Sequence, residues 1–296
     1  MTARVFLNRV WKQFFGTGLS KVLDDFGAQG EAPLHGELLD WLAAEFRDGG
    51  WNVKGLVRLI VTSDAYRRSS VASAAELAAD PLNRELGRQG RWRHDAEFVR
   101  DNALQVAGLL VNRVGGPSVK PYQPDGYWEN LNFPVRTWQA DTGESQYRRG
   151  LYTWWQRSFL HPSMLAFDAP SREECVAERN RSNIPQQALV LLNDPTFVES
   201  ARALAASSFG KGANHEARLD WMFRKVLQRV ASPVERKTLL ELVGRHQAGF
   251  AADRAAAKDV LTVGLAARPE GDEADIAAWT SVARVLLNLH ETVSRF

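Results

Sequence analysis

Residues 170–205, PSREECVAERNRSNIPQQALVLLNDPTFVESARALA, join a strongly charged stretch to two helix starts, and they decide the fold. Asn183 and Gln186 have the spacing of a capping box, and Asp194 directly before Pro195 is typical of a second helix start. The apolar residues behind each start recur three or four positions apart. We therefore expect two consecutive core helices and a helical C-terminal half.

The charged front of this stretch is a candidate polar junction. Its residues are Arg172, Cys175, Arg179, Arg181 and Asn183. We expect the arginines to pair with the glutamates beside them as the chain enters the helix. A lone cysteine among arginines could instead have a lowered pKa and act as a thiolate. The sequence favours a small buried apolar residue, because the glutamates offset the arginines and no nearby histidine could serve as a base.

Helical spacing of apolar residues also recurs outside this stretch. It predicts helices over 2–15, over 35–46 and from Asn52 onward, although β-branched residues leave a strand open for the third. Further helix starts are predicted at Asp80, Asp95 and Ser232. We expect the helix from Asp95 to be closed by Gly115 and Gly116. Alternating strand patterns are scarce, so the predicted fold class is mainly α with few or no strands.

The chain of 296 residues is long enough for one large domain or two lobes. Between 117 and 146 the periodicity vanishes, and glycine, proline, asparagine and aromatic residues take over. We expect an N-terminal helical lobe over 1–116 and a C-terminal helical lobe over 147–296. The aromatic segment, residues 117–146, would connect them as one family domain.

Aromatic residues gather in and just after the aromatic segment, where 122–155 hold four of the ten tryptophans and four of the five tyrosines. The candidate ligand-binding rings are Tyr122, Tyr127, Trp128, Trp138, Trp154 and Trp155. With polar side chains nearby, such rings could stack on a sugar and orient its hydroxyls. Those polar residues are Asp125, Asn130, Asn132 and Arg136. The alternative, which the sequence favours, is that the rings are buried in the core between the two lobes and anchor the segment there.

Charge and composition exclude several classes of protein. The formal net charge is only +2, which gives no electrostatic reason for a polyanionic partner, so we expect no nucleic acid. The basic group Arg88, Arg91, Arg93 and Arg100 alternates with acidic residues, and we expect it to form a solvated or salt-bridged helix face. No run of 18 apolar residues exists, and Met1 leads at once into an amphipathic pattern, so neither a membrane span nor an export signal is expected.

Residues that could carry chemistry are few. The six histidines lack the spacing of a helical metal site, and no metal is expected. A weak acid and histidine cluster could form from Asp24, Asp25, Glu31 and His35, although turn and helix-border roles suit these residues better. The single cysteine cannot form an internal disulfide, and no Gly-rich phosphate loop or Gly-x-Ser-x-Gly elbow is present.

Seven motifs in order along the chain resemble the planctomycete-specific domain one family, also called domain of unknown function 1553. They are RVFLNRVWKQFFGTGL, DDFGAQGEAPLHGELLDWLAAEF, GWNVKGLVRLIVTSDAYRRSS, GGPSVKPYQPDGYWE, RRGLYTWWQRS, FDAPSREECVAERNRSNIPQQALVLLNDPTFVESARALA and WTSVARVLLNLHE. The resemblance runs from Thr2 to about Glu291. A single short motif could arise by chance, whereas seven in the right order could not plausibly do so.

The resemblance implies a domain that usually ends a longer, exported protein. Relatives also carry a second domain of unknown function and often a cytochrome-c-like haem region, so the implied partners are the domains normally fused to this one and the implied location is exported or periplasmic. This chain has no Cys-x-x-Cys-His, so we expect no covalent haem here, and it starts where the domain starts, as an isolated, split or truncated form would.

Two functions of different class fit the sequence. The first is a helical interaction module that works through contacts with its companion domains. The second is a carbohydrate-active or redox-linked enzyme that uses the aromatic segment as a glycan subsite. Exposure of the Trp128 and Trp138 rings discriminates between them, because a sugar can stack only on an accessible ring face.

Overall fold

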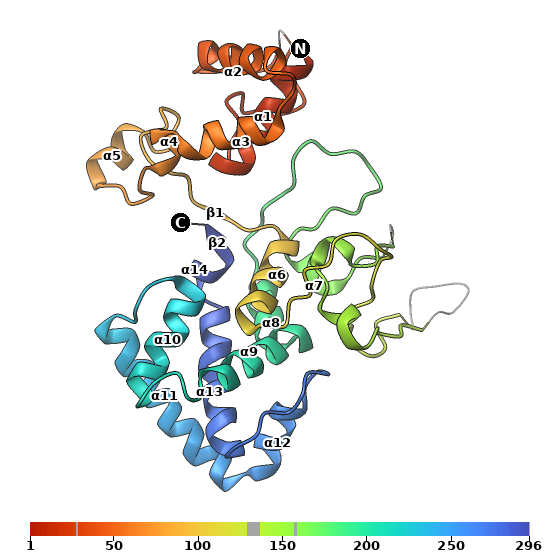
Figure 1. Ribbon diagram of the computed structural model, residues 1–296, viewed down its shortest axis with the longest axis vertical. Helices are drawn as coiled ribbons and strands as arrows, with labels where there is room; N and C mark the ends of the chain where they lie inside the picture. The colour runs from red at the N-terminus through yellow and green to blue at the C-terminus, as the bar shows by residue number, and fades with distance from the viewer. Residues whose placement is uncertain (28, 129–136, 157–158, 296) are drawn as a thin grey trace. The chain divides into compact units, whose positions relative to one another are not determined.

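The structure is a computed structural model that describes residues 1–27, 29–128, 137–156 and 159–295. These residues are mainly helical and contain one short antiparallel sheet of two strands, β1 (Trp92–Arg93) and β2 (Ser294–Arg295) (Figure 1). The predicted mainly-α class with few strands is thereby confirmed.

The chain divides into two compact units by its internal contacts. Unit 1 comprises Met1–Arg93, Val176–Glu178 and Ser294–Phe296, and unit 2 comprises His94–Cys175 and Arg179–Val293. The three-part division expected from the sequence, 1–116, 117–146 and 147–296, stays a prediction. In the part of the chain that the structure describes, no helix is both long and apolar enough to cross a membrane.

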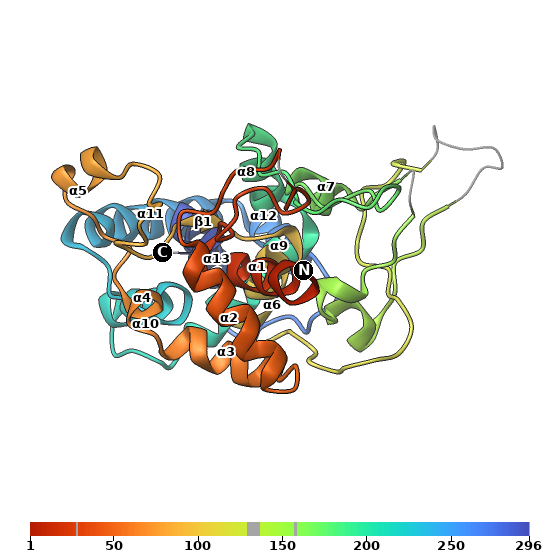
Figure 2. The same cartoon turned by 90° about the horizontal axis from the view of Figure 1, so that it is seen from above.

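Unit 1 is built on an apolar face that α1, α2 and α3 share. Its helices are α1 (Thr2–Phe15), α2 (Gly36–Asp48), α3 (Val53–Thr62), α4 (Asp64–Arg67) and α5 (Ala74–Ala79). Leu7, Leu42 and Ile60, one from each of the first three helices, are buried in the same cluster, and Figure 2 shows these helices packed together. Asn52 caps α3 by accepting a hydrogen bond from the Gly55 amide at 2.9 Å. The third element is therefore a helix and not the alternative strand.

No helix starts at Asp80, contrary to prediction. Asp80 instead follows the last residue of α5, and its carboxylate accepts hydrogen bonds from the amides of Arg84 and Glu85, both at 2.9 Å. The Arg88 guanidinium then donates to the Asp80 carbonyl at 2.8 Å. A short acidic side chain that bonds nearby amides stabilises a turn as readily as a helix start, and here the turn forms.

Unit 2 has its apolar core along α13. Its helices are α6 (Ala96–Ala107), α7 (Pro162–Ala166), α8 (Pro185–Asn193), α9 (Pro195–Ser208), α10 (His215–Leu227), α11 (Pro233–Ala252), α12 (Arg254–Thr262), α13 (Glu273–Leu287) and α14 (His290–Val293). α13 packs against α9 and α11 (Figure 1). Trp279 of α13, Leu204 of α9 and Val243 of α11 are buried in one cluster. The helical C-terminal half is confirmed.

The predicted starts of the helices in unit 2 are partly right. Asp194 caps α9 through the Thr196 amide at 2.9 Å, and Ser232 heads a complete capping box on α11. The capping box predicted at Asn183 is wrong, because α8 begins one residue later with Ile184 as its cap and Pro185 in its first turn. Proline supplies the fixed φ of a first turn without any side-chain cap.

The helix that begins after Asp95 is shorter than predicted. α6 ends at Gly108, which has a positive φ of 75°, and not at Gly115. Its Asp95 makes no capping hydrogen bond. The described part of the aromatic segment beyond it is irregular apart from the 3-10 turn η1 (Gly143–Tyr147), which a second turn, η2 (Gly150–Tyr152), follows. This irregular backbone needs hydrogen-bond partners from outside itself.

Candidate functional site

A buried carboxylate on α9 is the centre of a polar network in unit 2. Glu199 is fully buried. It accepts hydrogen bonds from the hydroxyls of Tyr122 at 3.1 Å and Tyr147 at 2.9 Å, and from the Ala266 amide at 2.5 Å. Arg202, one turn further along α9, places a guanidinium nitrogen 3.7 Å from the same carboxylate. These partners offset the large cost of removing a carboxylate from water.

The two tyrosines beside Glu199 are protonated donors at neutral pH. Burial, followed by the neighbouring carboxylate, raises the pKa of Tyr122 to about 12. The same two causes raise the pKa of Tyr147 further. Neither phenol can serve as a base near neutrality, because ionisation would place a second anion against Glu199.

The network also fixes the loop between α12 and α13. Arg202 donates to the carbonyls of Ala266 and Ala267, both at 2.9 Å, and the Leu265 amide donates to the Tyr122 hydroxyl at 2.9 Å. Gly264 has a φ of +85°, and a Cβ there would lie 2.2 Å from the Glu199 side chain. This position therefore requires glycine for both its backbone conformation and its space.

A second part of the network surrounds His161, which is 2% exposed. Its Nε2 lies 2.7 Å from the Tyr122 carbonyl oxygen, and its Nδ1 lies 2.8 Å from the Ser163 hydroxyl. Burial, with the charge of Arg100 as a further cause, lowers the pKa of His161 to about 4. Burial also raises the pKa of Asp194, whose carboxylate accepts a hydrogen bond from the Thr196 amide at 2.9 Å.

Two buried arginines hold irregular backbone near the aromatic segment. Arg100 donates to the carbonyls of Arg148 at 2.6 Å and Gln146 at 2.7 Å. Arg148 donates in turn to the carbonyls of residues 113, 115 and 117, and it stacks on the Tyr152 ring at 3.9 Å. The prediction of a solvated helix face is wrong for Arg100, which is buried because the loop needs its donors inside, although its guanidinium also lies 4.0 Å from the Asp101 carboxylate.

The tryptophans of the candidate ligand site pack on one another. The ring centroids of Trp128, Trp138 and Trp154 are 5.6 to 6.0 Å apart, and the Lys120 ammonium lies over two of these rings. Trp128 is only 5% exposed, whereas Trp138 and Trp154 are half-buried. Aromatic pairs at this separation contribute to stability beyond the area they bury.

The polar atoms of these rings bind the chain itself. The Trp128 indole N–H donates to the Gln123 side chain at 2.5 Å, and that of Trp138 donates to a backbone carbonyl at 2.9 Å. The Trp155 indole N–H donates to the Ser171 carbonyl at 3.2 Å. The Tyr127 hydroxyl donates to a backbone carbonyl at 3.4 Å. Of the polar residues expected beside the rings, Asp125 is exposed, and three lie outside the described residues. Those three are Asn130, Asn132 and Arg136.

Two arginines of the polar junction, Arg179 and Arg181, pair with carboxylates at the start of α6. Arg179 donates to both oxygens of Glu97, at 2.7 and 3.2 Å, and lies 3.7 Å from Asp95. Arg181 approaches Asp95 at 4.0 Å. Carboxylates are favoured at the start of a helix, where they can also pair with an arginine. The Asp95 carboxylate faces Arg179 and makes no capping hydrogen bond to the helix.

The remaining junction residues do not form a common site. Arg172 stacks on the Trp155 ring at 4.0 Å, and Asn183 is exposed ahead of α8. Cys175 is exposed, so the expectation of a buried apolar cysteine is wrong. The segment around it has no regular secondary structure that could bury the thiol.

Of the acid and histidine cluster of unit 1, Arg84 contacts Glu31 and His35. The Arg84 guanidinium pairs with Glu31 at 2.6 Å, and the His35 ring donates from Nε2 to the Arg84 carbonyl at 3.0 Å. Asp25 accepts from a backbone amide two residues on, and Asp24 is exposed. Across the described ranges, no three His, Cys, Asp or Glu side chains are grouped to hold a metal ion.

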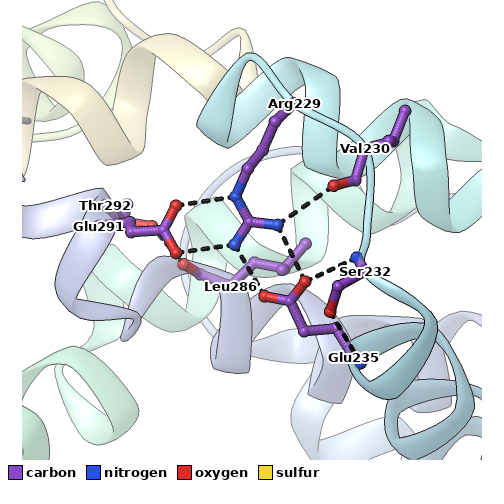
Figure 3. Close-up of polar contacts among 7 residues, drawn as sticks. All are labelled: Arg229, Val230, Ser232, Glu235, Leu286, Glu291 and Thr292. Atoms are coloured by element: carbon purple, nitrogen blue, oxygen red, sulfur yellow. Dashed lines mark hydrogen bonds and ion pairs between the residues drawn. The ribbon is translucent and has the colours of Figure 1, made fainter. Parts of the chain in front are cut away.

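Figure 3 shows one further polar cluster, where Arg229 bridges two carboxylates. Its guanidinium donates to both oxygens of Glu291, at 2.8 and 2.7 Å, and to both oxygens of Glu235, at 2.9 and 2.7 Å. It also donates to the Val230 carbonyl at 3.1 Å, and Glu235 accepts from the Ser232 amide. This clamp fastens the start of α11 to α14.

The fold and these sites define a mainly helical protein whose buried polar groups hold irregular backbone. The chain belongs to the DUF1553 family: the family model PSD1, described as a protein of unknown function, matches residues 1–243. No curated protein and no solved structure matches the chain.

Proposed function

We propose that the chain is a helical protein-interaction module of a larger exported multidomain system. The observation that carries this proposal is that tryptophan N–H groups in and just after the aromatic segment are bound by the chain itself. Trp128 is 5% exposed, and the indole N–H groups of Trp128, Trp138 and Trp155 are bound to the chain itself. A glycan subsite needs open ring faces and polar groups that a sugar can reach. The arrangement therefore supports an interaction module more than it supports a carbohydrate-active or redox-linked enzyme.

Two exposed tryptophans in unit 1 support an interaction role. Trp41 on α2 is 54% exposed and Trp51, just after α2, is 46% exposed. The Trp51 ring packs edge-on against Phe46 at 5.2 Å, and Phe6 stacks on Phe46 at the same distance. Tryptophan is the residue most enriched at the energetic centres of protein interfaces, because it buries a large rigid surface with little loss of entropy.

The proposed partners are the domains that accompany this family in longer proteins. The resemblance of the motifs supports this choice, and it also supports an exported or periplasmic location. Contacts with a protein partner would bury the exposed indoles, whose surface costs free energy while it faces water.

Isothermal titration calorimetry with the second domain of unknown function from a longer relative tests the proposal. The unmodified chain should bind this domain, and the double variant Trp41→Ala with Trp51→Ala should bind at least roughly tenfold more weakly. Leu82→Ala, which trims another exposed apolar side chain of unit 1, is the matched control and should bind as the wild type does.

Two results would contradict the interaction module. One is that the companion domain does not bind, or binds the double variant as tightly as the wild type. The other is turnover of an oligosaccharide by the unmodified chain, which would favour the enzyme in its place.

A further inference from the structure

The outer face of α2 in unit 1 carries a largely exposed tryptophan. The residues that this helix buries are Leu39, Leu42, Ala43 and Phe46. Because each residue advances a helix by about 100°, positions 37, 41 and 45 lie on the side away from these buried residues. Trp41 is 54% exposed, and within the described ranges its side chain makes no ring contact, cation contact or hydrogen bond. The indole face is therefore open to a partner.

The same helix face is acidic. Four of the thirteen residues of α2 are acidic and one is basic, although the formal charge of the whole chain is +2. Two of these carboxylates pair with arginines, at 2.5 and 2.7 Å. The other two, Glu37 and Glu45, are exposed, and neither forms an ion pair in the part of the chain that the structure describes. They lie about one helical turn before and one turn after Trp41.

An open indole between two exposed carboxylates suits a cationic side chain. The face of the indole ring is electrically negative and attracts an ammonium or guanidinium group. An arginine can stack on the ring while its N–H groups donate to a carboxylate. An acidic partner would be repelled, and an apolar partner would take both carboxylates out of water without pairing them. Charge complementarity therefore selects a basic partner.

We propose that the outer face of α2, defined by Glu37, Trp41 and Glu45, docks a basic segment of the partner protein, with an arginine or lysine side chain on the Trp41 ring. This inference rests on the proposed interaction function and adds the charge of the surface that the partner presents. The two carboxylates attract the basic segment from a distance, and the indole supplies the close contact.

The other exposed tryptophan of unit 1, Trp51, is an internal control. Trp51 is 46% exposed, but its ring packs edge-on against Phe46 at 5.2 Å. The helix that follows it, α3, contains Lys54 and Arg58 and no acidic residue. These two bases disfavour a second cation nearby, so Trp51 should respond to a cationic ligand much less than Trp41 does.

NMR of the full chain, read at the indole N–H signals, tests the docking face with a tetra-arginine peptide whose ends are capped. Trp41→Leu and Trp51→Leu assign the two signals. The peptide should shift the Trp41 signal and leave that of Trp51 nearly unchanged. A tetra-citrulline peptide has the same shape without the charge and should shift neither. Raising NaCl from about 50 to about 300 mM should weaken the binding of the arginine peptide.

Removal of the two carboxylates tests their part in the contact. Glu37→Gln with Glu45→Gln should weaken the binding of the arginine peptide by at least ~3-fold, since each exposed charge pair contributes little. Glu241→Gln with Glu270→Gln makes the same change in net charge at exposed positions of unit 2 and should leave binding as in the wild type. Equal effects of the two double variants would overturn the proposal.

Three further results would also overturn it. They are a Trp41 signal that the arginine peptide does not shift, an equal response to the citrulline peptide, and a dimer in sedimentation that Trp41→Leu dissociates. The dimer would show that a second copy of the chain covers this face.

The companion domain separates this proposal from the proposed function. If the companion domain binds the chain while the arginine peptide leaves Trp41 unchanged, the interaction module stands and the basic contact is wrong. If the arginine peptide binds at Trp41 and the companion domain does not bind, the basic contact is supported and the proposed function is contradicted.

Discussion

The apolar core along α13 and the buried side chains that hold the described part of the aromatic segment both lie in unit 2, yet their chemistry is opposite. The core cluster contains alanine, leucine, valine, phenylalanine and one fully buried tryptophan. The aromatic segment is held by arginine, glutamate, glutamine, tyrosine and histidine side chains. The backbone groups of a helix are hydrogen-bonded within the helix, so its buried face needs only apolar contacts. Irregular backbone needs hydrogen-bond donors and acceptors from other parts of the chain.

This difference changes the interpretation of buried charge. Arg100, Arg148 and Arg202 are all buried, and each donates mainly to backbone carbonyls. Strongly perturbed ionisable groups mark functional sites, but structural networks perturb them as well. In this protein the buried charges account for how a long irregular segment can be packed against helices.

The largest expected effect comes from breaking the apolar core. Leu191→Asp places an unpaired charge at a position that is 2% exposed in the main cluster, and should cost about 3–5 kcal/mol. Thermal unfolding followed by circular dichroism checks this. Leu189→Asp, on the same helix but largely exposed, is the control and should melt near the wild type. A wild-type melting temperature for Leu191→Asp would show that α8 is not part of the core.

The next effect should come from the backbone clamp of the aromatic segment. Arg148→Met keeps the apolar stem but leaves three loop carbonyls without their donor, so we expect a loss of about 2–4 kcal/mol in urea unfolding. Its neighbour Arg149, partly exposed and 3.5 Å from Asp101, is the control as Arg149→Met. Equal losses in the two variants would contradict the distinction between the buried and the exposed arginine.

A smaller, pH-dependent effect is expected at Arg229. The Arg229 guanidinium lowers the pKa of Glu235 to about 2, below the ~4.3 of an unfolded chain. This stabilisation is complete above the unfolded pKa and is lost as pH falls through the folded one. Arg229→Gln should cost about 1 kcal/mol at neutral pH, since these side chains are partly exposed, and much less near pH ~2.

Urea unfolding of Arg229→Gln at several pH values measures this effect. Arg224→Gln, at an exposed position earlier in the same region, should show no such pH dependence. A difference from wild type that is the same in acid and at neutral pH would refute the carboxylate clamp.

The smallest expected effect is the removal of one phenol donor. Tyr147→Phe deletes the hydroxyl that lies 2.9 Å from Glu199, and should cost about 0.5–1.5 kcal/mol because other donors still reach the carboxylate. Chemical unfolding measures the loss. Tyr152→Phe is the comparison variant, because it removes a hydroxyl that accepts a hydrogen bond from the Gly115 amide, whereas the Tyr147 hydroxyl donates one. An unchanged free energy of unfolding for Tyr147→Phe would show that the hydrogen bond to Glu199 does not stabilise the segment.

The sequence predicted regular elements well because their signals are local. The stripe over 2–15 and the Ser232 capping box each lie within a few turns of chain, and both helices form there. One local signal failed beside a distant partner. Asp95 has the pattern of a cap, but Arg179, more than eighty positions away, pairs with it.

The polar network was beyond sequence reasoning for the same reason. Tyr122 and Glu199 lie 77 positions apart, and Tyr147 and Glu199 lie 52 apart. Glu199 and Arg202 have the spacing of an ordinary surface pair on a helix. Glu199 and Arg202 lie among small and apolar residues of α9, which indicates a buried helix face. The neighbouring sequence does not indicate which loops these two side chains bind.

Indole hydrogen exchange measured by NMR tests most directly whether the tryptophan N–H groups in and just after the aromatic segment are bound by the chain itself. The indole N–H groups of Trp138 and Trp155 donate to backbone carbonyls and should exchange slowly, whereas those of exposed Trp41 and Trp51 should exchange rapidly. Added oligosaccharide should leave all four signals unchanged. Rapid exchange at Trp138 and Trp155, or a shift of their signals with sugar, would contradict the account.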